Sequence, residues 1–130
     1  MITSIRVPAV LYGVALLAAG VLAPTVIARP ARAPAGTVGM RHEKFSQETV
    51  TVRRGATLTF VNDSGWLHVI GPGDEGRIGA QPGSARMGAR GAVVSESGAN
   101  FTTGPWNTPG TYHITCSLHP EMNITVIVTG

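Results

Sequence analysis

The stretch Thr111-Tyr-His-Ile-Thr-Cys116-Ser-Leu-His119-Pro-Glu-Met122 joins a strand-like run to a loop rich in metal-binding side chains. Within seven residues this loop holds a thiol, an imidazole and a thioether, on Cys116, His119 and Met122. Thiolate and imidazole bind both oxidation states of copper, and a weak axial thioether tunes the balance between them. The loop therefore predicts a copper site.

A trigonal copper site needs a second histidine from elsewhere in the chain. His68 offers it, because it follows a strand-like run and the dense turn signal Asn62-Asp-Ser-Gly65. Each residue alone would be unremarkable, since a lone cysteine is usually a small buried hydrophobe. The compressed spacing favours one copper ion bound by His68, Cys116 and His119, with Met122 as the axial ligand.

The first 33 residues predict an export signal. Arg6 gives a short positive start, an apolar run extends from residue 7 to residue 28, and small residues follow. Cleavage is expected after Ala28, Ala33 or Ala35, which leaves residues 34–130 as one exported domain in the periplasm, the cell envelope or the extracellular space. Retention as a membrane anchor stays open, because about 20 apolar residues span a bilayer.

Composition argues against several classes of function. Without the leader the chain has seven basic and seven acidic residues and no basic cluster with interleaved aromatics, so we expect no nucleic-acid partner. The single cysteine cannot form a disulfide within the chain, and metal binding is the simplest reason to keep an unpaired thiol in an oxidising compartment. The sequence has no carboxylate pair in an acid–base arrangement and no Ser/His/Asp arrangement, so we do not expect an enzyme. We expect a monomer.

Short alternating apolar runs predict an all-β domain. Residues 49–53 and 57–62 are expected to form a hairpin around Arg54-Gly55, with one face of each strand buried. Further strands are expected at Val38–His42, Trp66–Ile70, Ala92–Val94, Thr111–Cys116 and Asn123–Thr129. No helical apolar period follows the leader, so seven or eight short strands predict an antiparallel Greek-key β-sandwich.

The remaining segments give weaker signals. Residues 71–98 carry many glycines, so we expect mostly irregular surface there. His113 is out of phase with Cys116 and should face away from the metal. Met87 should be a core residue, and an ordinary strand position is expected for His42 rather than an external copper site with Met40.

The run from Pro109 to Met122 resembles the final strand, loop and strand of the cupredoxins, the small blue-copper domains. Its short Cys-x-x-His-x-x-Met spacing is similar to that of the amicyanins, whereas plastocyanin-like proteins have a longer gap before the Met. The segment from Phe45 to His68 resembles the strands that lead to the first ligand. Together the similar regions cover most of residues 38–128, with a poor match at residues 71–98.

The resemblance implies a β-sandwich with one type 1 copper ion on the same four residues, and electron transfer through His119 to a docked redox partner. Leu67 and Leu118 are expected to contribute to an apolar collar around His119. Many cupredoxins have Asn after the first histidine, where this chain has Val69, so the reduction potential does not follow from the resemblance.

Two functions follow from this reading. The first is an exported blue-copper protein that carries single electrons between redox proteins by cycling between Cu(II) and Cu(I). The alternative is a copper-binding protein for delivery, storage or resistance.

Overall fold

A computed structural model describes residue 20, residues 36–88 and residues 91–130 of the 130-residue chain. The predicted export signal, residues 1–33, lies outside the described residues except for Gly20. No helix among the described residues is long and apolar enough to cross a membrane.

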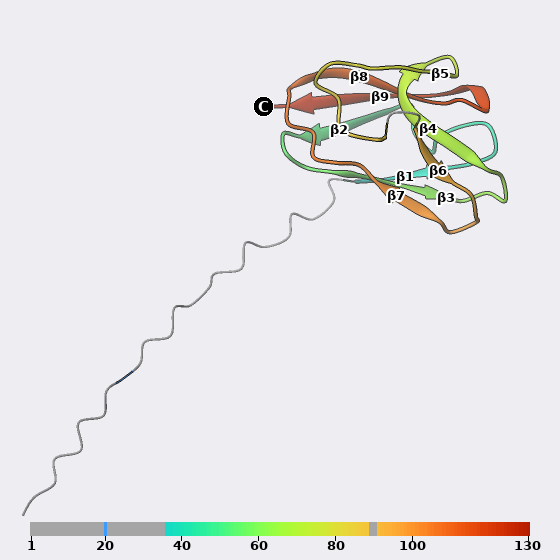
Figure 1. Ribbon diagram of the computed structural model, residues 1–130, viewed down its shortest axis with the longest axis horizontal. Coiled ribbons are helices and arrows are strands. Elements are labelled where there is room, and N and C mark those ends of the chain that lie inside the picture. Colours follow the sequence, from blue (N-terminus) through green and yellow to red (C-terminus); the bar gives the residue numbers. More distant parts are fainter. Residues whose placement is uncertain (1–19, 21–35, 89–90) are drawn as a thin grey trace, which may run out of the picture. The chain divides into compact units, whose positions relative to one another are not determined.

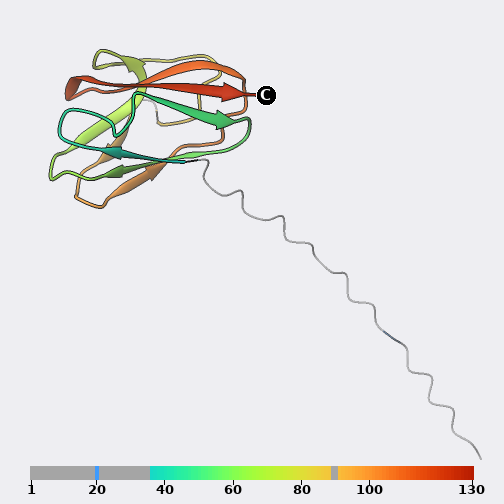
Figure 2. The same ribbon diagram turned by 180° about the vertical axis from the view of Figure 1, so that it is seen from behind.

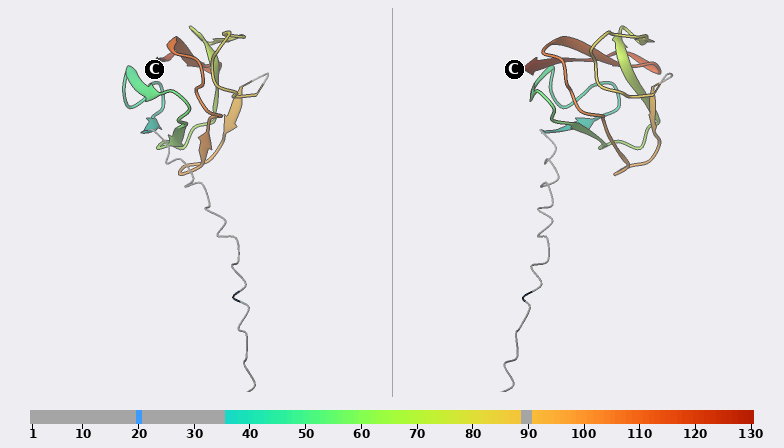
Figure 3. Two further views of the ribbon diagram at one scale, coloured as in Figure 1. Left: turned by 90° about the vertical axis from the view of Figure 1, so that its left-hand side faces the viewer. Right: turned by 60° about the vertical axis from the view of Figure 1, so that its left-hand side comes forward.

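The described residues form an all-β domain, and none of them is helical. Its strands are β1 (Gly36–Met40), β2 (Thr49–Arg53), β3 (Leu58–Asn62), β4 (His68–Asp74), β5 (Arg77–Ile78), β6 (Ala92–Val94), β7 (Asn100–Thr102), β8 (Gly110–Cys116) and β9 (His119–Thr129). One sheet has the order β1-β3-β7 and the other β2-β9-β8-β4-β5, with β6 paired to β4. Figure 1 shows these sheets as two layers, and Figure 3 shows them from the side.

The predicted β-sandwich is confirmed, but its sheets are mixed rather than purely antiparallel. β1 runs parallel to β3, and β2 runs parallel to β9, while the other strand pairs are antiparallel. Alternating burial does not distinguish the two directions, because a strand buries the same side chains whichever way its neighbour runs.

The predicted hairpin between β2 and β3 is wrong, because these strands lie in different sheets. The turn at Arg54-Gly55 carries the chain across the sandwich. Arg54 N donates to Thr129 O at 2.8 Å, and Trp106 N donates to Ala56 O at 2.9 Å, so both sides of the turn are tied to other segments. Strands on opposite sides of a sandwich bury every second side chain in the shared core. Two strands of a hairpin do the same, so the alternating pattern fits both arrangements.

The core lies between the two sheets. Its largest fully buried side chains are Trp106, Phe60, Met40, Leu58, Ile70, Ile114, Met122 and Ile124. The expected phase of β8 is confirmed, because Tyr112, Ile114 and Cys116 are all buried. Cys116 is therefore the last inward residue of a strand that belongs to the core.

The glycine-rich segment is more ordered than we expected from its composition. Its first residues extend β4 as far as Asp74, and the chain returns in β5. Gly76 lies in the turn between them with a φ of 76°, and a Cβ there would lie 3.1 Å from the Pro120 ring. The glycine lets this turn pack against the loop that follows β8.

Candidate metal centre

The three strongest ligand candidates meet at one end of the sandwich. His68 opens β4, Cys116 closes β8 and His119 opens β9. The β8–β9 turn lies at the end opposite the C-terminus in both Figure 1 and Figure 2. The candidate ligands therefore come from two loops supported by central strands of one sheet.

The β8–β9 turn contains only Ser117 and Leu118, and Cys116 pairs directly with His119 across it. A register shift between Thr115 and Cys116 interrupts the ladder at this point. Such an irregularity re-aims the side chains beside it. The short turn therefore brings the thiol and the imidazole to the same end of the hairpin.

The ligand atoms of these residues converge. The sulfur of Cys116 lies 3.8 Å from Nδ1 of His68 and 3.5 Å from Nδ1 of His119, and all three ligand atoms lie within 4.8 Å of one another. The distances fit a shared metal ion. With zinc bond lengths as a scale, about 2.3 Å to sulfur and 2.0 Å to nitrogen, a bound ion would separate sulfur from nitrogen by roughly 3.5 to 3.7 Å.

Burial favours the neutral imidazole that a metal needs. His68 and Cys116 are fully buried, and His119 is partly buried. Desolvation is the main cause that lowers the pKa of His68 from its ordinary value of 6.5, and the charges of His119 and His42 lower it further. A lowered pKa reduces the competition between protons and a metal ion for this ring.

Met122 lies three residues after His119 on β9 and is fully buried. Its backbone oxygen accepts a hydrogen bond at 3.2 Å from the hydroxyl of Thr115, and that hydroxyl accepts one at 2.8 Å from Gly76 N. Buried Thr115 thus connects the β4–β5 turn to the strand that carries Met122. The hydrogen bonds of Thr115 therefore hold the backbone at Met122 in place beside the core.

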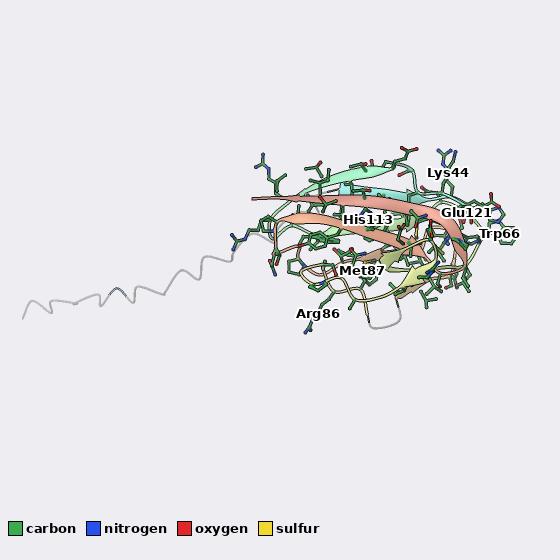
Figure 4. The ribbon with its side chains drawn as sticks, turned by 90° about the horizontal axis from the view of Figure 1, so that it is seen from above. Lys44, Trp66, Arg86, Met87, His113 and Glu121 are labelled. Atoms are coloured by element: carbon green, nitrogen blue, oxygen red, sulfur yellow. The ribbon has the colours of Figure 1, made fainter. Side chains whose placement is uncertain are left out.

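The structure places the other candidate residues in different environments. His113 is exposed on β8, as expected from its phase, and Met87 is buried in the core. In Figure 4, His113 lies along the body of the sandwich, while Trp66 and Glu121 each lie toward one end of it. His113 does not belong to the cluster of converging ligand atoms. Met87 lines a pocket that includes none of the ligand candidates.

The expected strand position of His42 is wrong, because β1 ends at Met40 and His42 lies in the following loop. Its ring stacks on Trp66, with 4.1 Å between centroids, and its centroid lies 5.5 Å from that of His119. Met40 is fully buried, so the two residues do not share an external site. The sequence spacing gave no signal that His42 would lie beside His119.

Comparisons of the sequence alone identify no relative, since no family model and no curated protein matches the chain. Solved structures do match. The amicyanin of Paracoccus versutus has 22% sequence identity and a TM-score of 0.56, and the alignment covers 77% of this chain and 86% of that one. A purple cupredoxin from Nitrosopumilus maritimus has 20% identity and a TM-score of 0.55, with coverage of 72% and 99%. The chain thus has the cupredoxin fold.

Proposed function

We propose that this chain is an exported type 1 copper protein that carries single electrons between redox proteins. His68, Cys116 and His119 would hold the ion, with Met122 as a weak axial ligand. The observation that carries the proposal is the convergence of one thiol sulfur and two imidazole Nδ1 atoms at 3.5 and 3.8 Å. A thiolate with two imidazoles and a thioether is the ligand set of blue-copper electron-transfer sites.

Bound copper would supply one-electron chemistry by changing between Cu(II) and Cu(I). The protein's part is to keep the ligands in place while the charge changes. Cys116 closes a central strand and His68 opens the strand paired to it, with Ile70 opposite Cys116 in the ladder. Ligands built on paired strands move little, and a fixed geometry lowers the reorganisation that accompanies electron transfer.

Exposed apolar side chains support docking near His119. Leu118, Trp66 and Leu67 are 50%, 54% and 44% exposed, although large apolar side chains are usually buried. Leu118 directly precedes His119, and Trp66 reaches it through the stacked ring of His42. Electrons would enter and leave through the accessible edge of His119. Such an apolar rim suits brief contact with a redox partner, because electron-transfer interfaces are small.

The buried thiol is compatible with the proposed export. Cys116 is free and fully buried, so it is protected from the solvent while it faces two imidazoles. In an oxidising compartment a metal would protect this thiol further, because ligation keeps it from reacting with other thiols. We propose that residues 1–33 direct the chain out of the cytoplasm and that the exported domain acts as a monomer.

The test separates an electron carrier from a copper-delivery protein. The copper-loaded domain is reduced and reoxidised repeatedly beside a Cu(I) chelator, and retained copper is measured after each cycle. A carrier completes the cycles with its copper bound, and the Cys116→Ser variant loses it. Transfer of most of the copper to the chelator on the first reduction would overturn the electron-carrier proposal and favour delivery.

A further inference from the structure

A partly buried side-chain network lies behind His68, on the side away from Cys116. The outer ring nitrogen of His68, Nε2, lies 3.1 Å from the hydroxyl oxygen of Ser64. Ser64 belongs to the turn between β3 and β4, and its hydroxyl also lies 2.8 Å from Oδ1 of Asn62. The direction of these hydrogen bonds decides which nitrogen of His68 carries the proton.

The orientation of the Asn62 amide is fixed by its surroundings. Its Nδ2 group donates to the carbonyl oxygens of Trp66, at 2.7 Å, and of Val94, at 3.2 Å. Turning the amide over would aim its own carbonyl at two other carbonyls. Asn62 is fully buried, so water cannot relieve such a conflict. Oδ1 therefore faces Ser64.

An amide oxygen only accepts hydrogen bonds. Oδ1 of Asn62 accepts one from Ser64 N at 2.9 Å, and the 2.8 Å contact with the Ser64 hydroxyl must contain the hydroxyl proton. Ser64 has no other proton on this oxygen. Its two lone pairs can accept from Trp66 N, at 3.2 Å, and from His68 Nε2. His68 must therefore be the donor in its contact with Ser64.

We propose that Ser64 is a positioning residue that keeps the proton of His68 on Nε2 and so leaves the Nδ1 lone pair directed at the metal site. The relay runs from the buried amide of Asn62 through one hydroxyl to the ligand ring. It also orients the ring, because a hydrogen bond to the outer nitrogen opposes rotation. The effect of Ser64 on metal binding rests on the proposed function. The tautomer of His68 is a property of the metal-free protein and does not depend on that function.

The relay also joins the two sheets at the ligand end. Asn62 closes β3 of the three-stranded sheet, and Val94, which accepts from its Nδ2, belongs to β6 of the other sheet. Val94 pairs with His68 in the β4–β6 ladder. The backbone under His68 and the ring of His68 are thus tied to the same amide. The Asn62 side chain thus sets both the position of His68 and the ring nitrogen that carries its proton.

The first readout uses the metal-free protein with reduced Cys116. A long-range ¹H–¹⁵N correlation spectrum of the histidine rings, recorded at mildly alkaline pH, identifies the protonated nitrogen of each ring. The native chain should show His68 protonated at Nε2. Ser64→Ala should give a mixture of the two tautomers, and Ser64→Thr, which keeps the hydroxyl, should restore the native pattern. Ser46→Ala is the matched control, because the Ser46 hydroxyl accepts a hydrogen bond from Gly39 N at 2.9 Å and takes no part in the hydrogen bonds of His68.

The second readout is the affinity for Zn²⁺, a redox-inert probe, by chelator competition. Loss of an outer partner of a ligating histidine typically weakens metal binding by roughly 10- to 100-fold, which we expect for Ser64→Ala and not for Ser46→Ala. Protonation of native His68 at Nδ1, or unchanged tautomer and affinity in Ser64→Ala, would overturn the inference. Failure of the copper protein to cycle electrons would overturn only the proposed function.

Discussion

The amide nitrogen of Ser117 donates a hydrogen bond to the carbonyl oxygen of Val69 at 2.9 Å. Each residue directly follows a candidate ligand, Cys116 and His68 respectively. Many cupredoxins tie the two ligand loops together through an Asn side chain at the position of Val69. In this chain the hydrogen bond between Ser117 N and Val69 O links the two loops through their backbones. This link needs no polar side chain, so it is compatible with valine at position 69.

Replacement of Met122 by leucine tests the proposed axial ligand. The change is close in volume, so the fold should survive with a loss of less than about 1.5 kcal/mol. We expect the visible absorption of the copper form to persist and its reduction potential to rise, because loss of an axial electron donor destabilises the more highly charged Cu(II) more than Cu(I). Protein-film voltammetry gives the potential.

Met87→Leu is the matched control, since Met87 is a core methionine that is 2% exposed and lines a pocket that includes none of the ligand candidates. Its potential should equal that of the native chain. A Met122→Leu variant with an unchanged potential would show that the thioether is not a ligand.

Introduction of a charge beside His119 should slow electron exchange between two copies of the protein. In Leu118→Lys, two docked copper ends would place like charges together, and added salt should partly restore the rate. Line broadening in NMR spectra of mixed oxidised and reduced protein measures this self-exchange. Ile127→Lys is the control, because Ile127 is 37% exposed on β9 beside Thr111, away from the ligand loops. Equal rates in the two variants would refute docking through the apolar rim.

A methyl group at position 76 should disturb the metal centre through Pro120. Gly76→Ala places a side-chain carbon 3.1 Å from the Pro120 ring and also strains a backbone with φ of 76°. Gly98→Ala has a similar φ of 83° but nothing within 4 Å of the new carbon. The left-handed conformation should cost each variant about 1–2 kcal/mol in unfolding free energy.

Only Gly76→Ala should also change the electron paramagnetic resonance spectrum of the Cu(II) form, because Pro120 follows the candidate ligand His119. Denaturant unfolding supplies the stability of both variants. Identical copper spectra in Gly76→Ala and the native chain would mean that the β4–β5 turn does not support the ligand loop.

The stability of the metal-free protein should fall as the pH drops below 6.5. The pKa of His68 is lowered in the folded chain, chiefly by burial, so below 6.5 the unfolded chain binds a proton that the folded chain does not. Stability then decreases with falling pH until the lowered pKa is reached. Melting temperatures recorded across this window should show the decline, and His68→Gln should flatten it. A slope unaffected by His68→Gln would contradict this assignment.

Much of the metal centre could be predicted from sequence because its chemistry is concentrated in a short loop. The spacing of Cys116 and His119 on either side of a tight turn needs little tertiary information, and the structure brings both together with His68. Met122 stays a proposed ligand. The all-β class also followed from alternating runs, since burial of one strand face is a local pattern.

The parts that could not be predicted depend on contacts between distant segments. The crossing at Arg54-Gly55 looks like a hairpin turn because both arrangements bury alternate residues. His42 lies beside His119 through a loop whose course no local pattern encodes. The turn signal at Asn62–Gly65 was recognised, but its role in holding His68 depends on Val94, 32 residues further along the chain.

The most direct test of the copper site is a titration of the metal-free protein with Cu(II), followed by visible absorption beside the Cys116→Ser variant. A copper site on these residues should give an intense band from thiolate-to-copper charge transfer that grows to one equivalent, bleaches on reduction, returns in air and is absent from the variant. Tight binding of copper without this band, or the same spectrum in Cys116→Ser, would contradict a copper site built on Cys116, His68 and His119.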